Sequence, residues 1–136
     1  MARASELLPW SWASERLSVE RNYWVATVTG RGLPHARPVW GVWHDDVLYL
    51  SVGAAGFRRV DERREVSVHV DSAVDVVIVD GIAERIGDGG VPSEAVSAYT
   101  AKYDMDGGQW INFAMTPRVA FGWRDGDVNT ATRWTF

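Results

Sequence analysis

The sequence predicts a mostly β protein, a small antiparallel β-barrel with a few helices. Short segments rich in β-branched and aromatic residues follow one another closely along the 136 residues. Turn signals separate several of them, at 44–46 and 71–73 for example. The most strand-like segment, 74–84, contains Gly81. A glycine inside a strand indicates a bulge or a sharp bend, which barrels need at their corners.

The expected strands are short and occur on both sides of a helical region. They are 23–29, 34–43, 46–53, 65–71, 74–86 and 118–124, with the tail 130–136 as a further extended segment. The first two flank the sequence Thr29-Gly30-Arg31-Gly32, whose glycines suit a hairpin turn. We therefore expect six or seven antiparallel strands.

Three short helices are expected between or before the strands. The first is amphipathic and covers 11–21, with Ser11 as its N-cap and with Trp12 and Leu17, and Val19 as a further candidate, in its buried stripe. A charged helix covers 56–64. The third covers 92–104, begins at Pro92 and carries three apolar residues on one face, which are Val96, Tyr99 and Tyr103.

Composition bounds the function. The length predicts a single domain, 1–136. The net charge of −4 argues against nucleic-acid binding, which needs an excess of cations. No apolar run is long enough for a membrane span and the first residues do not form a signal peptide. The absence of cysteine fits a cytoplasmic protein. Eight tryptophans indicate core and interface packing, or a wall for a planar ring.

The strand expected at 34–43 is unusual. It carries Arg37, Pro38, Trp40 and Gly41 within five residues. A central strand excludes proline and gains little from glycine. The pattern therefore indicates an edge, or a place where a ligand approaches the backbone.

The common catalytic motifs are absent: no cysteine, nucleophile elbow or P-loop is present. The three histidines, His35, His44 and His69, fall in separate segments, so no metal site is predicted. His35 lies in the unusual strand region and is either a ligand-facing residue or a solvent-facing one.

Two basic features remain. Arg58 and Arg59 follow Ser51 and the glycine-containing loop 53–56, where a helix N-terminus and guanidinium groups together favour a phosphate. The alternative is that nearby carboxylates pair with them on a solvated helix face. The C-terminal Arg133 and Trp134 either pack against the barrel or a partner subunit, or reach a ligand.

With these residues described, the chain resembles the pyridoxamine 5′-phosphate oxidase-like split β-barrel family, in particular its actinobacterial branch that depends on the deazaflavin coenzyme F-420. The matching segments occur in the family order: Trp12 with Arg16-Leu17, 23–28, 32–35, 38–43, Leu48-Tyr49, 76–84, Ala98-Tyr99, Lys102-Tyr103 and 132–136. They extend over nearly the whole chain.

The resemblance implies a homodimer with two cofactor sites at the subunit interface. The strand that contains Pro38, Val39, Trp40 and Gly41 would lie along the ring of the cofactor, F-420 or, as the alternative, FMN. The family has a Ser-Arg-Lys-like phosphate triplet in the region of 53–59, and this sequence departs from it by lacking the lysine. Arg58 and Arg59 are the nearest substitutes, with Arg37 on the neighbouring strand.

Two functions follow from the resemblance. One is an oxidoreductase in which reduced F-420 transfers a hydride to a small conjugated or heteroaromatic acceptor, with His35, Tyr103 and Arg133 as candidate proton donors or substrate anchors. The other is a module that binds a flavin, deazaflavin or tetrapyrrole without turnover. The cofactor-binding residues expected are Arg37, Pro38, Val39, Trp40, Gly41, Ser51, Arg58, Arg59 and Trp134.

Overall fold

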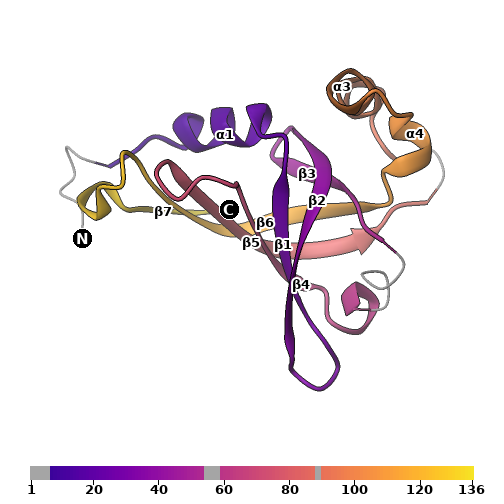
Figure 1. The fold of residues 1–136 in the computed structure, drawn as a ribbon, viewed down its shortest axis with the longest axis horizontal. Coiled ribbons are helices and arrows are strands. Elements are labelled where there is room, and N and C mark those ends of the chain that lie inside the picture. Colours follow the sequence, from indigo (N-terminus) through magenta and orange to yellow (C-terminus); the bar gives the residue numbers. More distant parts are fainter. Residues whose placement is uncertain (1–6, 54–58, 88–89) are drawn as a thin grey trace.

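A computed structural model describes residues 7–53, 59–87 and 90–136. The elements in chain order are α1 (Trp10–Val19), β1 (Tyr23–Val28), β2 (Pro34–His44), β3 (Val47–Ser51), β4 (Glu65–His69), β5 (Val76–Arg85), α3 (Ser93–Tyr103), α4 (Gly107–Trp110), β6 (Phe113–Trp123), the short 3-10 helix η2 (Val128–Thr130) and β7 (Thr132–Thr135). Figure 1 shows the strands crossing steeply, with the β1–β2 hairpin projecting beyond the other strands.

Six strands close into a ring. Their order is β3-β2-β1-β4-β5-β6, and an antiparallel pairing of β3 with β6 joins the two ends. β7 adds to the outer side of β6. All pairings are antiparallel, so the expected fold class is confirmed.

The bulge expected at Gly81 is present, and the register between β5 and β6 shifts between Asp80 and Gly81. Gly81 lies opposite Pro117. A Cβ atom at Gly81 would meet the Thr116 carbonyl oxygen at 2.2 Å, so the two strands approach more closely there than a side chain allows.

Apolar and polar residues alternate along the strands, and the apolar side chains point inward and fill the barrel. The inward side chains of β1, β4, β5 and β6 pack with Ala13 and Leu17 of α1. A second, smaller core joins α3 to β2 and β3 through Val42, Tyr49, Tyr99 and Tyr103. Two layers of packing thus hold α1 and α3 on the barrel.

Several element boundaries differ from the expectation. α1 begins at Trp10, not after Ser11, and Val19 is 74% exposed, so it does not belong to the buried stripe. β6 begins at Phe113, five residues before the predicted strand, because the bulge accommodates Pro117 within it. In the helix predicted at 56–64, residues 59–62 are helical and 56–58 lie outside the described residues.

Candidate functional site

The site begins where β2 changes its partner. Residues Pro34 to Val39 pair with β1, and residues Trp40 to His44 pair with β3. Within the described ranges, no strand pairs with the other edge of the segment from Pro34 to Val39. This backbone edge of β2 is therefore open, which agrees with the interpretation of Pro38 as the mark of an edge. Gly41 lies in the part of β2 that pairs with β3, where a Cβ atom would meet the Tyr49 carbonyl oxygen at 2.7 Å.

A cleft of about 330 Å³ adjoins this point. β2, the end of β3, α3, the segment after α3 and α4 supply its lining, which consists of Pro38, Val39, Trp40, Ser51, Tyr99, Met105 and Trp110. The volume and the mainly apolar lining are typical of sites for small organic molecules. Four of the predicted cofactor-binding residues, Pro38, Val39, Trp40 and Ser51, thus line one cleft.

Trp40 forms one wall of the cleft. Its ring is stacked on Tyr103, with centroids 4.5 Å apart and 4° between the planes, and the residue is still 39% exposed. On the floor, the hydroxyl groups of Ser51 and Tyr99 are hydrogen bonded at 2.6 Å. An indole held flat by a second ring is a suitable surface for another planar group.

Tyr103 itself lies behind the wall. Its hydroxyl oxygen accepts a hydrogen bond from the Gly41 N–H at 3.0 Å, and its single proton faces two acceptors, the Arg21 carbonyl oxygen at 2.6 Å and the Gly41 carbonyl oxygen at 3.0 Å. Burial raises its pKa. The Tyr103 hydroxyl proton is thus engaged by backbone carbonyls, and the residue, predicted as a proton donor or substrate anchor, does not line the cleft of its own chain.

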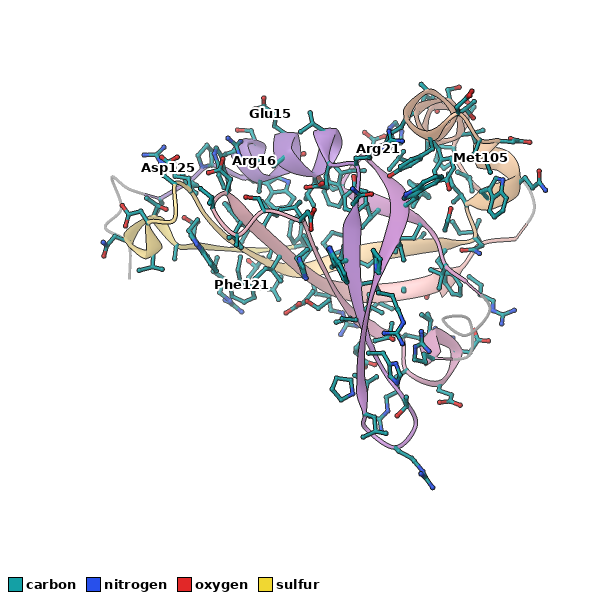
Figure 2. The ribbon with its side chains drawn as sticks, viewed as in Figure 1. Glu15, Arg16, Arg21, Met105, Phe121 and Asp125 are labelled. Atoms are coloured by element: carbon teal, nitrogen blue, oxygen red, sulfur yellow. The ribbon has the colours of Figure 1, made fainter. Side chains whose placement is uncertain are left out.

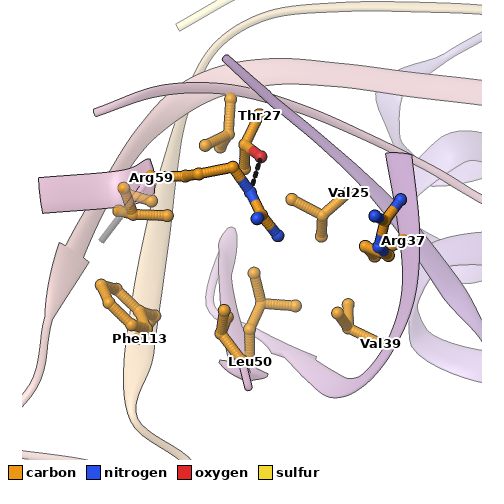
Figure 3. Close-up of a pocket in the computed structure, with 11 residues that line it drawn as sticks. Val25, Thr27, Arg37, Val39, Leu50, Arg59 and Phe113 are labelled. Atoms are coloured by element: carbon orange, nitrogen blue, oxygen red, sulfur yellow. Dashed lines mark hydrogen bonds between the residues drawn. The ribbon is translucent and has the colours of Figure 1, made fainter. Parts of the chain in front are cut away.

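A second cavity lies inside the barrel and touches the cleft region at Val39. It is small, about 20 Å³, which is room for about one water molecule. Arg37 and Arg59 both line it, and Figure 3 shows the Arg59 guanidinium extending across it below Thr27. The Nε atom of Arg59 donates to Thr27 Oγ1 at 2.9 Å.

These two arginines are available cations. Neither forms a salt bridge with a carboxylate of the described residues. For Arg59, this argues against the alternative in which its helix face is neutralised by acidic neighbours, whereas Arg85 does pair with Asp61 at 2.6 Å. Arg58 lies outside the described residues.

The remaining predicted residues do not line the cleft of the same chain. His35 is half-buried on β2, opposite Thr27, with its Nδ1 atom 3.4 Å from Arg37 Nη2. Arg133 is exposed on β7. Trp134 packs edge-on against Trp10 with centroids 5.4 Å apart, and its Nε1–H donates to the Leu8 carbonyl at 3.1 Å. Within one chain, Trp134 thus serves packing.

Three cleft residues have no catalytic or cofactor-binding role assigned from the sequence, although Met105 and Trp110 belong to a segment expected to form part of the pocket floor. Met105 and Trp110 fall in the segment 104–117, whose conformation the sequence does not determine. Figure 2 shows Met105 beside α3 and α4. Tyr99 was predicted only as a core residue of its helix, and that position on the buried face is what brings its hydroxyl to Ser51.

Among residues 7–53, 59–87 and 90–136, no three histidine or carboxylate side chains gather as they would around a metal ion. In the same ranges, no helix has the length and apolar character needed to cross a membrane.

No protein-family model matches the sequence, and no curated protein matches it. Solved structures do share its fold. A protein from Clostridium acetobutylicum, related to general stress protein 26 of Bacillus subtilis and of the pyridoxinephosphate oxidase family, aligns with a TM-score of 0.67 at 12% identity, covering 95% of this chain and 97% of that one.

Two further solved structures with a similar fold are named after different bound groups. A structure named F420 Reductase aligns with a TM-score of 0.61 at 18% identity, over 79% of this chain and 94% of that one. A heme binding protein from Mycobacterium smegmatis aligns with a TM-score of 0.69 at 18% identity, over 99% of this chain and 60% of that one. The chain therefore has the split β-barrel fold, which hosts several functions.

Proposed function

We propose that the chain belongs to the pyridoxamine 5′-phosphate oxidase-like family and is an oxidoreductase that uses reduced coenzyme F-420 with a small conjugated or heteroaromatic substrate in the cytoplasm. The observation that carries the proposal is the apolar cleft beside the open edge of β2, with Arg37 and Arg59 close to the same strand and without a salt bridge to any described carboxylate. This combination suits a planar ring that continues into a phosphate.

The residues present fit such a cofactor. Trp40 offers a flat face, and the open edge of β2 offers backbone groups to the polar edge of a ring. Val39 lines both the cleft and the arginine-lined cavity, so a ligand in the cleft would extend past Val39 toward Arg37 and Arg59. Guanidinium groups without a carboxylate partner favour a phosphate.

When bound, the reduced deazaflavin supplies the hydride. The part of this chain is to bind, orient and exclude water. Trp40, Met105 and Trp110 provide apolar surface around the cleft. We assign the proton-holding role to the Ser51–Tyr99 hydroxyl pair, because these hydroxyls line the cleft and Tyr103 does not.

We also propose that the chain is a homodimer. Trp40 and Trp110 border the cleft and are 39% and 45% exposed, which is unusual for indole rings in a monomer. A second copy would cover this rim and close the cleft. His35, Arg133 and Trp134, which do not line the cleft of their own chain, remain candidate site residues that a partner subunit would contribute.

Titration of the purified chain with F-420 and, in parallel, with FMN tests the proposal. We expect quenching of F-420 fluorescence with saturation, weaker binding of FMN, and loss of F-420 binding by about tenfold or more in Trp40→Ala. If FMN binds more tightly than F-420, the proposed cofactor is a flavin and not a deazaflavin. Binding of neither compound would refute the enzyme proposal.

A second candidate is a binding module without turnover. The sequence after β3 favours it, because the segment 53–59 lacks the lysine of the family's phosphate triplet. A heme or flavin that binds at the cleft, together with F-420 that neither binds nor turns over with any acceptor, would select this alternative. Addition of hemin, followed by its absorbance band, distinguishes a tetrapyrrole from a flavin.

A further inference from the structure

The chain uses lysine only once. Of its 14 lysine and arginine residues, Lys102 is the only lysine. It lies near the end of α3, half-buried between that helix, β1 and β2. An arginine presents a wide planar fork, whereas an ammonium group is compact and directs three donors around one atom. The position of this single lysine therefore indicates a site that requires a compact cation.

The Lys102 ammonium joins two elements. Its Nζ atom donates to the Gly41 carbonyl oxygen at 2.9 Å and to the Tyr23 hydroxyl at 3.1 Å. It also lies 4.7 Å from the centroid of the Tyr23 ring and 5.3 Å from that of Tyr103. Two fixed acceptors and two aromatic faces thus surround one nitrogen.

The Gly41 peptide needs hydrogen bonds from α3 because β2 changes its neighbouring strand just before this residue. Its register partner in β3 is Leu50, whereas β1 pairs only as far as Val39. On the side that β1 leaves, α3 takes the place of a strand. The Gly41 N–H donates to Tyr103 Oη, and the Gly41 carbonyl accepts from Lys102 at 2.9 Å and from the Tyr103 hydroxyl at 3.0 Å. Unpaired backbone groups at this buried position would be costly.

The neighbouring residue forms the cleft wall. Trp40 stacks on Tyr103, so the same turn of α3 that binds the Gly41 peptide also supports the Trp40 ring. We propose that Lys102 is a positioning residue, which fixes the Gly41 peptide against α3 and so sets the orientation of the Trp40 wall for a planar ligand. The effect of Lys102 on ligand binding rests on the proposed function, whereas its effect on the orientation of Trp40 does not.

Two charged residues of the described chain, Glu20 and Arg21, act on the Lys102 ammonium. Glu20 and Arg21 come from the end of α1 and the segment before β1, and the Arg21 guanidinium donates to the Lys102 carbonyl at 2.7 Å. Figure 2 shows Arg21 in this region, between α1 and α3. Tyr23 belongs to β1, and Tyr103 to α3 itself. Burial lowers the pKa of Lys102 to about 8, against a raising effect of Glu20 and with a further lowering effect of Arg21.

A buried ammonium of this kind does not stabilise the fold through its charge, because burial disfavours the charged form. A lysine present only for stability would lose stability and binding together on substitution. A positioning lysine loses the orientation of Trp40 while the folded state persists. This difference separates the two roles.

The first experiment compares Lys102→Met and Lys102→Arg with the wild type by NMR, using the indole N–H resonance of Trp40, identified by its absence in Trp40→Phe. We expect this resonance to shift in both variants, with the midpoint of thermal unfolding lowered by a few degrees at most. Glu94→Gln, a substitution near the other end of α3, is the control and leaves the resonance in place. An unshifted Trp40 resonance in Lys102→Met would overturn the proposal.

The single lysine permits a second test, which is made on the folded wild-type protein with one variant as a control. Reductive methylation of the folded protein keeps the charge of Lys102 and leaves one N–H donor, whereas acetylation also leaves one N–H but removes the charge. Both reagents also modify the N-terminal amine, and Lys102→Arg identifies that contribution. We expect the acetylated protein to show the Trp40 shift and the methylated protein to show less of it. Equal spectra for both forms would contradict the proposal.

Ligand binding then distinguishes the two proposals. If the wild type binds F-420, we expect Lys102→Met to weaken it by about fivefold or more, and Glu94→Gln to leave it unchanged. If the wild type binds neither F-420 nor FMN, the proposed function fails while the Trp40 resonance still tests Lys102. Wild-type affinity in Lys102→Met would overturn its positioning role.

Discussion

The indole of Trp40 lies parallel to the phenol ring of Tyr103, with the ring centroids 4.5 Å apart. Trp40 belongs to β2 and Tyr103 to α3. The next residue of β2, Gly41, is 62 positions before Tyr103 in the sequence, and its N–H donates to the Tyr103 hydroxyl. The ring face of Tyr103 thus supports the Trp40 indole, and its hydroxyl group is hydrogen bonded to β2.

Substitution of Tyr103 should separate these contributions. Tyr103→Phe keeps the ring but removes the hydroxyl that bonds Gly41 and Arg21. We expect a loss of about 1–3 kcal/mol in the free energy of unfolding, because the Gly41 N–H is left buried without a partner. Tyr103→Leu should lose more, since the stack on Trp40 disappears as well. Urea denaturation measures both, and equal stability of Tyr103→Phe and the wild type would contradict the hydrogen-bond assignment.

Lys102 predicts a pH dependence of stability. Burial lowers its pKa in the folded state from 10.5 to about 8, so between these pH values the unfolded chain binds the proton and the folded chain does not. The free energy of unfolding therefore gains a contribution that rises with pH from about 8, is complete above 10.5, and is lost as the pH falls through 8.

Urea titrations of the wild type and of Lys102→Met at pH 7 and pH 9.5 measure this contribution. We expect the difference in the free energy of unfolding, wild type minus variant, to be larger at pH 9.5. A difference that is the same at both pH values would show that Lys102 has an ordinary pKa.

Gly81 is expected to tolerate no side chain. A Cβ atom there would lie 2.2 Å from the Thr116 carbonyl oxygen and 2.6 Å from the Met115 sulfur. Gly81→Ala should reduce the free energy of unfolding by about 2–4 kcal/mol, because backbone cannot move aside as a flexible side chain can. Gly53→Ala is the matched control, since nothing lies within 4 Å of its Cβ position. Similar urea midpoints for the two variants would argue against a rigid bulge.

The arginines near β2 should contribute to cofactor affinity. We expect Arg37→Ala and Arg59→Ala each to weaken F-420 binding, and Arg58→Ala combined with Arg59→Ala to weaken it by at least about tenfold, or 1.4 kcal/mol. Arg124→Ala, which removes an exposed guanidinium at the end of β6, is the control. Unchanged titration curves in the double variant would assign these arginines to a solvated surface.

Dimerisation can be measured directly. A homodimer has twice the chain mass of 15.2 kDa in light scattering after size exclusion. Trp110 is 45% exposed at the cleft, and we expect Trp110→Glu to shift the mass toward the monomer, because a charge at an interface core is unfavourable. Val128→Glu is the control, at an exposed residue of η2. A monomeric wild type would refute the dimer.

The fold was predictable because its strands carry strong local signals. The segment Val76–Arg85 is nearly continuous in β-branched residues, and Gly81 within it marks the bulge. The first part of β6 was not predictable, since Pro117 normally argues against a strand and only its place opposite the bulge permits it. The pairing of β3 with β6 depends on tertiary contacts between distant segments, which no local pattern contains.

The site was predictable only along β2. Pro38 and Gly41 break the ordinary strand pattern, and that irregularity led to the cleft. The opposite side was not predictable, because Met105 and Trp110 reach the cleft through the turns that join α3, α4 and β6. The burial of the Tyr103 hydroxyl depends equally on where α3 packs against β2, which spacing along one helix does not indicate.

The first and last segments of the described chain are hydrogen bonded to each other. Leu8 donates its N–H to Thr132 Oγ1 at 3.0 Å, and its carbonyl accepts from the Trp134 indole at 3.1 Å. During synthesis the first residues therefore emerge from the ribosome long before their partners do. The segment that precedes α1 can therefore reach its native place only after residue 134 has been synthesised.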